Sequence, residues 1–240
     1  MRLIVCENYD EMSKAAANII AAQVTLKPKS ILGLATGSTP IGMYNNLASM
    51  YSKGELDFSE VISFNLDEYY PLKKSNEQSY DYFMKDNLFS KINIKPENIH
   101  IPNGEAQNAE EECKNYDKMI AEKGGIDLQV LGIGNNGHIG FNEPGATLES
   151  GTNVTDLTED TIQVNSRFFN SIDEVPKRAI TMGMYPILSA KTILLLISGK
   201  SKNAALKRIL TGKITTDCPA SFLNIHSDAI VIVDKDAMNG

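Results

Sequence analysis

Short apolar runs that alternate with segments of helical spacing limit the possible folds of this chain more than any other feature. The runs resemble strands that are covered on both faces of a sheet, and they fall at residues 30–35, 61–66, 128–131, 192–198 and 229–233. Between the runs, apolar residues recur three or four positions apart, as at Met12, Ala16 and Ile20, which predicts helices. Strands and helices that alternate in this way predict an α/β fold: an open, mostly parallel sheet with helices on both faces.

The chain has 240 residues and no Gly/Ser/Pro-rich linker, so we expect a single domain that spans residues 1–240. Residues 146–177 are its least regular part and are rich in Thr, Ser and Asp. A stretch of this length within a compact domain is usually a functional loop. We therefore expect a lid at about residues 146–177.

The charge and residue composition exclude several classes of protein. A net charge of −7 leaves no basic stripe that could hold a nucleic acid. No apolar run approaches the ~20 residues of a membrane span. The three cysteines lack CxxC spacing and predict reduced thiols in a cytoplasmic protein. The three histidines lack the spacing of a metal motif, and we expect no metal.

One loop concentrates the groups that could carry chemistry. Residues 132–145 follow an apolar run and contain five glycines, three amides, His138 and Glu143. A buried strand that leads into such a loop usually carries a site at its carboxyl end. The pattern Gly-x-Gly-x-x-Gly at 132–137 also matches a dinucleotide-binding fingerprint, which requires a long helix after the third glycine. Asn142 and Pro144 prevent that helix, so we expect no nicotinamide cofactor.

Three further polar turns follow predicted strands. The turn at residues 36–39 leads into a helix that we expect at about residues 41–52, where Pro40 suits the first helical position and Thr39 the cap; the turn fits an anion site or a plain capped turn. Asp67 and Glu68 come directly after a strand, where one acid could be functional or could only cap the next segment. The turn at residues 199–202 supplies lysine. Because these turns share one edge of a parallel sheet, they could form one pocket for a phosphorylated substrate.

Four motifs together resemble the glucosamine-6-phosphate deaminase family, in its short bacterial form. They are LATGSTP at 34–40, SFNLDEY at 63–69, GIGNNGHIGFNEP at 132–144 and NSRFF at 165–169. The resemblance extends over essentially the whole chain. It implies a modified Rossmann-type sheet, no cofactor, and conversion of glucosamine 6-phosphate and water into fructose 6-phosphate and ammonia.

The resemblance also assigns roles to individual residues. Asp67 falls at the position of the enolisation base, and His138 at that of the group that opens the sugar ring, with Asn136 and Glu143 as its partners. Many family members carry Asp where this chain has Asn136, so Glu143 must supply the full charge beside the imidazole. The expected phosphate contacts are Thr36, Gly37, Ser38, Thr39, Arg167 and Lys202, although Lys200 lies close enough in sequence to replace Lys202.

Two alternative functions remain at this point. The chain could be a hydrolase like the 6-phosphogluconolactonases, which share the fold, or a sugar-phosphate sensor without catalysis. A sensor would have no use for the proton carriers Asp67, His138 and Glu143. We expect a small-molecule sugar phosphate as the partner, a monomer or weak homo-oligomer, and no allosteric activation by N-acetylglucosamine 6-phosphate.

Overall fold

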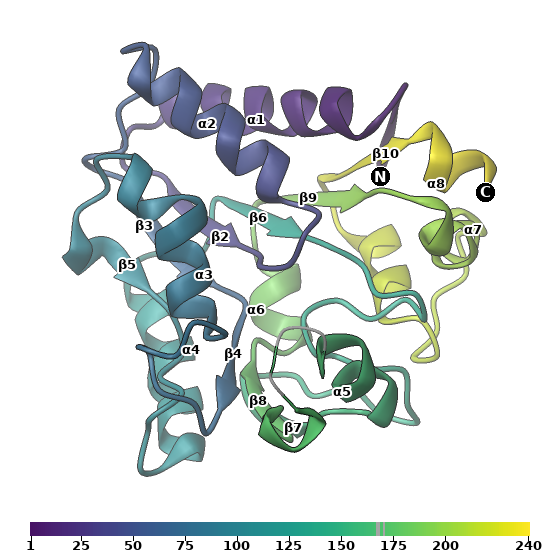
Figure 1. The fold of residues 1–240 in the computed structure, drawn as a ribbon. Coiled ribbons are helices and arrows are strands. Elements are labelled where there is room, and N and C mark those ends of the chain that lie inside the picture. The colour runs from purple at the N-terminus through teal and green to yellow at the C-terminus, as the bar shows by residue number, and fades with distance from the viewer. Residues whose placement is uncertain (167–168, 170) are drawn as a thin grey trace.

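A seven-stranded parallel sheet forms the centre of the molecule (Figure 1). The computed structural model describes residues 1–166, 169 and 171–240. In spatial order the strands are β1 (Arg2–Cys6), β10 (Ala229–Asp234), β9 (Thr192–Ile197), β6 (Leu128–Leu131), β2 (Ile31–Leu34), β3 (Ile62–Asn65) and β5 (Ile99–His100). All the pairings in this sheet are parallel. The carboxyl ends of β9, β6, β2 and β3 therefore lie next to one another along one edge.

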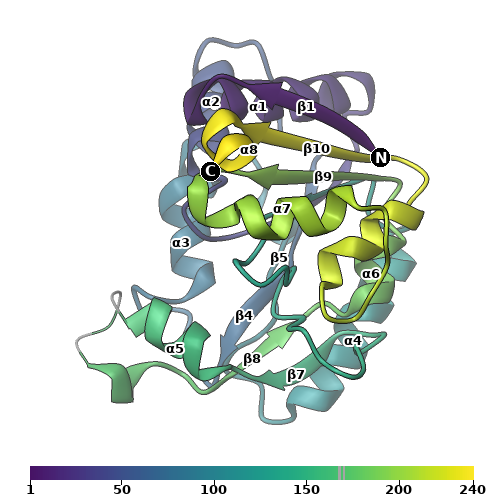
Figure 2. The same ribbon diagram turned by 90° about the vertical axis from the view of Figure 1, so that its right-hand side faces the viewer.

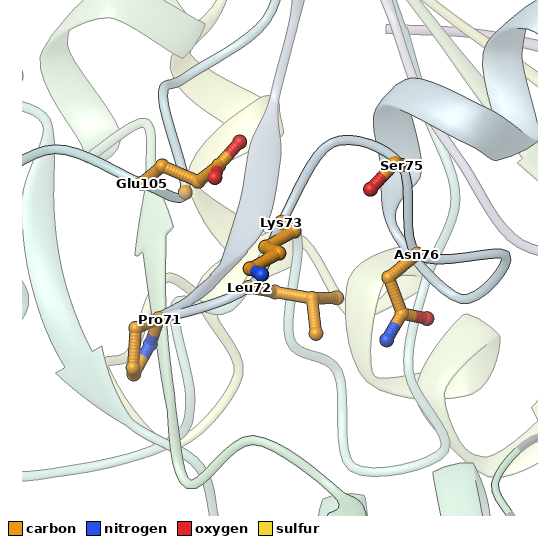
Figure 3. A pocket seen from close by; sticks show the side chains of 7 residues that line it. Pro71, Leu72, Lys73, Ser75, Asn76 and Glu105 are labelled. Atoms are coloured by element: carbon orange, nitrogen blue, oxygen red, sulfur yellow. The ribbon is translucent and has the colours of Figure 1, made fainter.

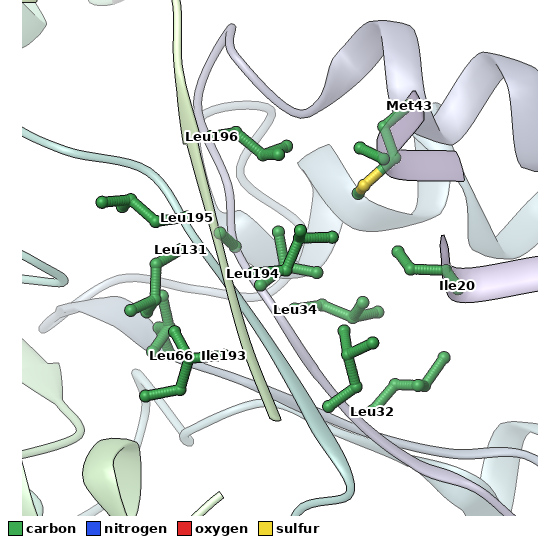
Figure 4. Packing of buried hydrophobic residues seen from close by; sticks show 14 of the residues in the cluster. Ile20, Leu32, Leu34, Met43, Leu66, Leu131, Ile193, Leu194, Leu195 and Leu196 are labelled. Atoms are coloured by element: carbon green, nitrogen blue, oxygen red, sulfur yellow. The ribbon is translucent and has the colours of Figure 1, made fainter. Parts of the chain in front are cut away.

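Helices cover both faces of this sheet. Figure 1 shows α1 (Tyr9–Leu26) and α2 (Ile41–Ser52) on one side, and α4 (Ala109–Glu122) and α6 (Met184–Leu188) on the other. Leu32 and Leu34 of β2 lie on the side of Ile20 from α1 and Met43 from α2 (Figure 4). Phe64 of β3 instead packs edge-on against Tyr116 of α4. The predicted open, mostly parallel sheet with helices on both faces is thus confirmed.

Four further helices lie elsewhere in the part of the chain that the structure describes. They are α3 (Tyr80–Asn87), α5 (Glu159–Asn165), α7 (Asn203–Leu210) and α8 (Lys235–Asn239), with short 3-10 turns at Phe89–Lys91, Pro96–Asn98, Ile172–Glu174, Lys200–Lys202 and Pro219–Ile225. No helix among the described residues combines the length and apolar character needed to cross a membrane.

A second, antiparallel sheet was not predicted. Its strands are β4 (Asp67–Tyr70), β8 (Arg178–Thr181) and β7 (Asn153–Asp156), in that order. The sequence had suggested a turn at residues 67–70, and the structure shows that this interpretation was wrong. Backbone pairing of Asp67 with Thr181, more than a hundred residues away, makes this segment a strand, and no local pattern encodes that pairing.

Two further expectations need correction. Residues 146–177 contain β7 and α5 and are therefore more regular than their composition suggested. Helix α2 begins at Ile41, as expected, but its N-cap residue is Pro40 and not Thr39, and no side-chain hydrogen bond caps it. Figure 2, turned by 90°, shows that α5 and the second sheet lie at one end of the molecule, away from α1 and α2.

Candidate active site

The sheet order places the polar turns side by side. Residues 199–202 follow β9, the loop at 132–145 follows β6, and the turn at 36–39 follows β2, while Asp67 comes just after β3. The histidine loop therefore lies between the lysine turn and the Thr/Ser turn, each one strand away. The expected common edge is present, and its order separates Asp67 from the lysines.

Glycines allow the histidine loop to fold tightly upon itself. The Gly134 N–H donates to the carbonyl of His138 at 2.9 Å, and the Gly137 N–H donates to the carbonyl of Gly134 at 3.1 Å. A Cβ atom at Gly134 would lie only 2.2 Å from Cε1 of His138. The imidazole therefore rests against the bare backbone of residue 134, which requires glycine.

Glu143 is the partner of the imidazole. Its Oε1 atom lies 3.0 Å from Nδ1 of His138, close enough for an ion pair when the ring is protonated, although the contact is too bent for a regular hydrogen bond. Its Oε2 atom accepts a hydrogen bond from Nδ2 of Asn136 at 2.6 Å. The side chains of His138 and Glu143 are only 26% and 14% exposed, so water screens this charge pair weakly.

Burial and hydrogen bonding act in opposite directions on Glu143. Desolvation raises the pKa of its carboxyl group, but contacts with His138, Asn136 and Thr161 lower it, and the net shift is downward. The carboxylate is thus kept ionised beside the imidazole. The carboxylate is therefore placed to interact directly with any positive charge that develops on the imidazole.

Asn136 supports the loop in a different way from that expected. Its Oδ1 atom accepts the backbone N–H of His138 at 3.1 Å, while its Nδ2 atom donates to Glu143. The amide therefore positions the backbone of the histidine and its carboxylate partner. Both functions need one donor and one acceptor, which an amide supplies and an ionised aspartate does not.

Asp67 is buried against the same loop. Its side chain is 6% exposed, and a Cβ atom at Gly140 would lie 3.6 Å from its Oδ2 atom. Burial, followed by repulsion from Glu68, raises the pKa of Asp67 to about 8. Gly140, which Asp67 contacts, follows His138 by two residues in the loop. A carboxyl group with a pKa near neutrality at this place is suited to act as a general base.

Glu68 has a structural role, which resolves the choice between the two acids. Its carboxylate accepts the backbone N–H groups of Tyr69, Tyr80 and Asp81, each at 2.9 Å. Two of these donors belong to the first turn of α3. Glu68 therefore caps that helix, whereas Asp67 remains available for chemistry.

The turn at residues 36–39 has the properties of an anion cradle. Its N–H groups and hydroxyl groups make no hydrogen bond within the described parts of the chain, and Gly37 takes a φ of 89°. The hydroxyl of Tyr9 donates to the carbonyl of Ser38 at 3.1 Å and accepts the N–H of Gly42 at 2.8 Å. Tyr9 thus fixes the turn and leaves the N–H and hydroxyl donors of residues 36–39 available for an anion.

The structure also separates the two lysines. Lys202 is half-buried and desolvation lowers its pKa; no carboxylate pairs with it in the described segments 1–166, 169 and 171–240. Lys200 is exposed and lies against Gly240 at the end of α8. A desolvated cation without a partner favours an anionic ligand, so Lys202 is the better candidate. Arg167, the other expected phosphate contact, lies outside the described residues.

Sequence reasoning missed three contacts to the site. Thr161 donates to Oε1 of Glu143 at 3.0 Å. Tyr9 holds the cradle, as described above. Arg208 donates to the carbonyl of Asn136 at 3.1 Å and to that of Asp217 at 2.5 Å. Each contact joins residues distant in the chain, and no local motif predicts it.

A surface hollow elsewhere does not belong to this constellation. It begins at the residue after β4 and is lined by Pro71, Leu72, Lys73, Ser75, Asn76, Gly104 and Glu105 (Figure 3). Within the described residues, no group of three or more His, Cys, Asp or Glu side chains could hold a metal ion. His138, Glu143 and Asp67 are groups that can exchange protons, and they lie beside the turn at residues 36–39 along the same edge of the sheet.

Known proteins are similar to this chain over nearly its whole length. Residues 7–232 match the family model described as glucosamine-6-phosphate isomerases/6-phosphogluconolactonase. The chain is 58% identical to a glucosamine-6-phosphate deaminase of Clostridioides difficile (strain 630), and 59% identical to one of Clostridium botulinum (strain Alaska E43 / Type E3). Both alignments cover 99% of this chain and 95% of the relative.

Solved structures give the same result. A monomeric glucosamine-6-phosphate deaminase superposes with a TM-score of 0.97 at 47% identity, covering 100% of this chain and 99% of the other. A 6-phosphogluconolactonase from Thermotoga maritima shares the fold, with a TM-score of 0.73 at 22% identity and coverage of 98% and 99%. The chain therefore belongs to the glucosamine-6-phosphate isomerase/6-phosphogluconolactonase family of enzymes, and by sequence identity it groups with the deaminases.

Proposed function

We propose that this chain converts glucosamine 6-phosphate and water into fructose 6-phosphate and ammonia. The observation that carries the proposal is the contact between His138 and Glu143 on a loop whose backbone also packs against Asp67. Two proton carriers on one loop match a reaction with two proton-transfer steps. The identity of 56–59% to proteins named glucosamine-6-phosphate deaminases supports the same reaction.

In the first step, His138 opens the sugar ring. A neutral imidazole accepts the proton of the C1 hydroxyl and returns it to the ring oxygen, which breaks the C1–O5 bond and leaves an aldehyde at C1. While the imidazole of His138 carries the extra proton, the ionised Glu143 beside Nδ1 stabilises the positive charge of the imidazolium. Two unit charges ~4 Å apart interact by about 4 kcal/mol at an effective dielectric constant of 20.

In the second step, Asp67 acts as the enolisation base. Its ionised form removes the proton from C2 of the open aldehyde, and the resulting acid delivers that proton to C1. The product is an imine at C2, to which water adds before ammonia leaves and fructose 6-phosphate remains. The raised pKa of Asp67, about 8, makes its carboxylate a stronger base than an ordinary aspartate.

The phosphate group is proposed to bind at the other end of the sugar. Thr36, Gly37, Ser38 and Thr39 offer N–H and hydroxyl donors, and Lys202 offers a charge, that have no partner among the residues the structure describes. Arg167 is a further proposed contact. Because these groups flank the histidine loop, a bound phosphate would hold C1 and C2 beside His138 and Asp67. We further propose that residues 146–177 form a lid over this site within a single domain.

The test is an assay of purified protein with glucosamine 6-phosphate, in which ammonia and fructose 6-phosphate are measured together. We expect equal amounts of both products, unchanged by a metal chelator. Asp67→Asn should abolish turnover, whereas Asp156→Asn, an exposed carboxylate on β7, should not. Hydrolysis of 6-phosphogluconolactone without deamination would favour the lactonase alternative, and binding without any product would favour a sensor. Gel filtration should give a monomer, as in the monomeric structural relative.

A further inference from the structure

A chain of hydroxyl groups connects helix α5 to the carboxylate beside the histidine. Thr158 lies at the amino-terminal end of α5, where its Oγ1 atom accepts the backbone N–H of Thr161 at 3.2 Å. The hydroxyl of Thr158 donates to that of Thr161 at 3.0 Å, and the hydroxyl of Thr161 donates to Oε1 of Glu143 at 3.0 Å. Hydrogen bonds in series polarise one another, so the last bond to the carboxylate is strengthened.

The oxygen that Thr161 contacts is the one that faces the imidazole. Oε1 of Glu143 lies 3.0 Å from Nδ1 of His138, while Oε2 is held by Asn136. His138 and Asn136 belong to the same loop as Glu143 and would move with it. Thr161 comes from a different part of the chain, so it fixes the rotation of this carboxylate relative to the rest of the molecule.

Apolar packing determines where Thr161 sits. Its neighbour Ile162 packs against a cluster formed by Tyr69, Phe141, Leu157 and Ala179. Tyr69 follows Asp67 by two residues, and Phe141 lies between His138 and Glu143 in the loop. Helix α5 therefore contacts both segments that carry the proposed proton-transfer groups, and Thr161 adds the polar part of that contact.

We propose that Thr161 is a positioning residue, which holds Oε1 of Glu143 against His138 and so makes ring opening depend on the placement of helix α5. The inference rests on the proposed deaminase function for its kinetic consequence. The contact itself does not depend on that function. A purely structural role, in which Thr161 only helps to begin α5, would leave the ionisation of Glu143 unchanged.

Three variants separate these roles. Thr161→Val removes the hydroxyl and keeps the shape, and Thr161→Ser restores the donor. Thr25→Val makes the same change at an exposed position of α1, outside residues 146–177. The other charged or titratable groups near Glu143 are the same in every variant: His138, Arg208 at the carbonyl of Asn136, and Asp67 beside Gly140. A difference in pH profile between the variants therefore does not come from these groups.

For each variant, kcat and KM for glucosamine 6-phosphate are measured across pH. Loss of a hydrogen-bond donor raises the pKa of a carboxylate, so Thr161→Val should move the acid limb of kcat/KM to higher pH by about one unit and lower kcat by about tenfold. Thr161→Ser and Thr25→Val should stay within about twofold of wild type, since neither removes a donor from Glu143. An unchanged acid limb in Thr161→Val, with only KM or thermal stability altered, would overturn the proposal.

A second measurement does not require activity. The carboxyl carbon of Glu143 can be followed by NMR against pH in the free protein, with Glu143→Gln to assign its signal. Its titration midpoint should rise in Thr161→Val and return in Thr161→Ser. If wild type does not deaminate the sugar but this midpoint still shifts, the proposed function fails and the Thr161 contact stands. If the midpoint does not move, the contact fails, whatever the activity.

Discussion

Replacing Asp67 with Asn should abolish catalysis and at the same time stabilise the fold at alkaline pH. Asp67 is 6% exposed, and burial with repulsion from Glu68 raises its pKa to about 8. In the unfolded chain an aspartate titrates near ~3.9. Between these two values the folded state holds a proton that the unfolded state has released, so wild-type stability falls as pH rises through this window.

The size of the effect follows from the two pKa values. Each pKa unit corresponds to about 1.4 kcal/mol, so the full difference of about four units sets an upper bound of ~6 kcal/mol. Between about pH 5 and about pH 8 the wild-type free energy of unfolding should fall by about 3–4 kcal/mol through this group alone. An amide stays neutral over that range, so the variant does not share the loss.

The assay is urea unfolding of wild type and Asp67→Asn at a series of pH values. The stability of the variant relative to wild type should increase with pH, while Asp156→Asn provides the control for removal of an exposed carboxylate. Exchange of the C2 proton of glucosamine 6-phosphate with deuterated water should be lost in Asp67→Asn alone. A stability difference that does not change with pH would refute the buried neutral carboxyl group, and retained exchange would refute the base assignment.

Three other predictions concern the anion cradle and the opposite edge of the sheet. Lys202→Ala should raise KM by about tenfold to a hundredfold, the cost of a charge-assisted hydrogen bond, while Lys200→Ala should leave KM unchanged. Competition assays with inorganic phosphate measure the same contact, and an equal loss of phosphate affinity in the two variants would contradict this assignment. Tyr9→Phe removes the hydroxyl between Ser38 and Gly42, and steady-state kinetics should show KM raised by about twofold to tenfold at unchanged kcat. Asp127→Asn should lower the free energy of unfolding in urea by about 2–4 kcal/mol because the buried carboxylate accepts from Lys27, Lys191 and the Ile31 N–H. Glu7→Gln, which breaks the exposed pair with Lys235, should change the free energy of unfolding by under ~1 kcal/mol. Similar losses of stability in Asp127→Asn and Glu7→Gln would argue against the role of burial.

The sequence by itself determined the elements of the main sheet and brought the candidate site residues to one edge of it. Apolar runs and helical spacing are local properties, so β2, β6, β9 and their flanking helices could be predicted from them. The glycines around His138 likewise predicted a tight loop, because a backbone that contacts a ring at Gly134 tolerates no Cβ atom. Thr36–Thr39, His138 and Glu143 were recognisable for the same reason, since their chemistry is contained in short motifs.

Only the tertiary structure decided which of these groups meet and which neighbours tune them. Asp67 and Glu68 are adjacent and chemically alike, yet one faces Gly140 and the other caps α3, because strand β4 alternates its side chains between two environments. Lys202 was separated from Lys200 by burial alone. Thr161 and Tyr9 reach the site from α5 and α1 through contacts that are close in space and distant in sequence. Such contacts depend on how helices pack on the finished sheet, and the spacing of residues within one segment carries no record of that packing.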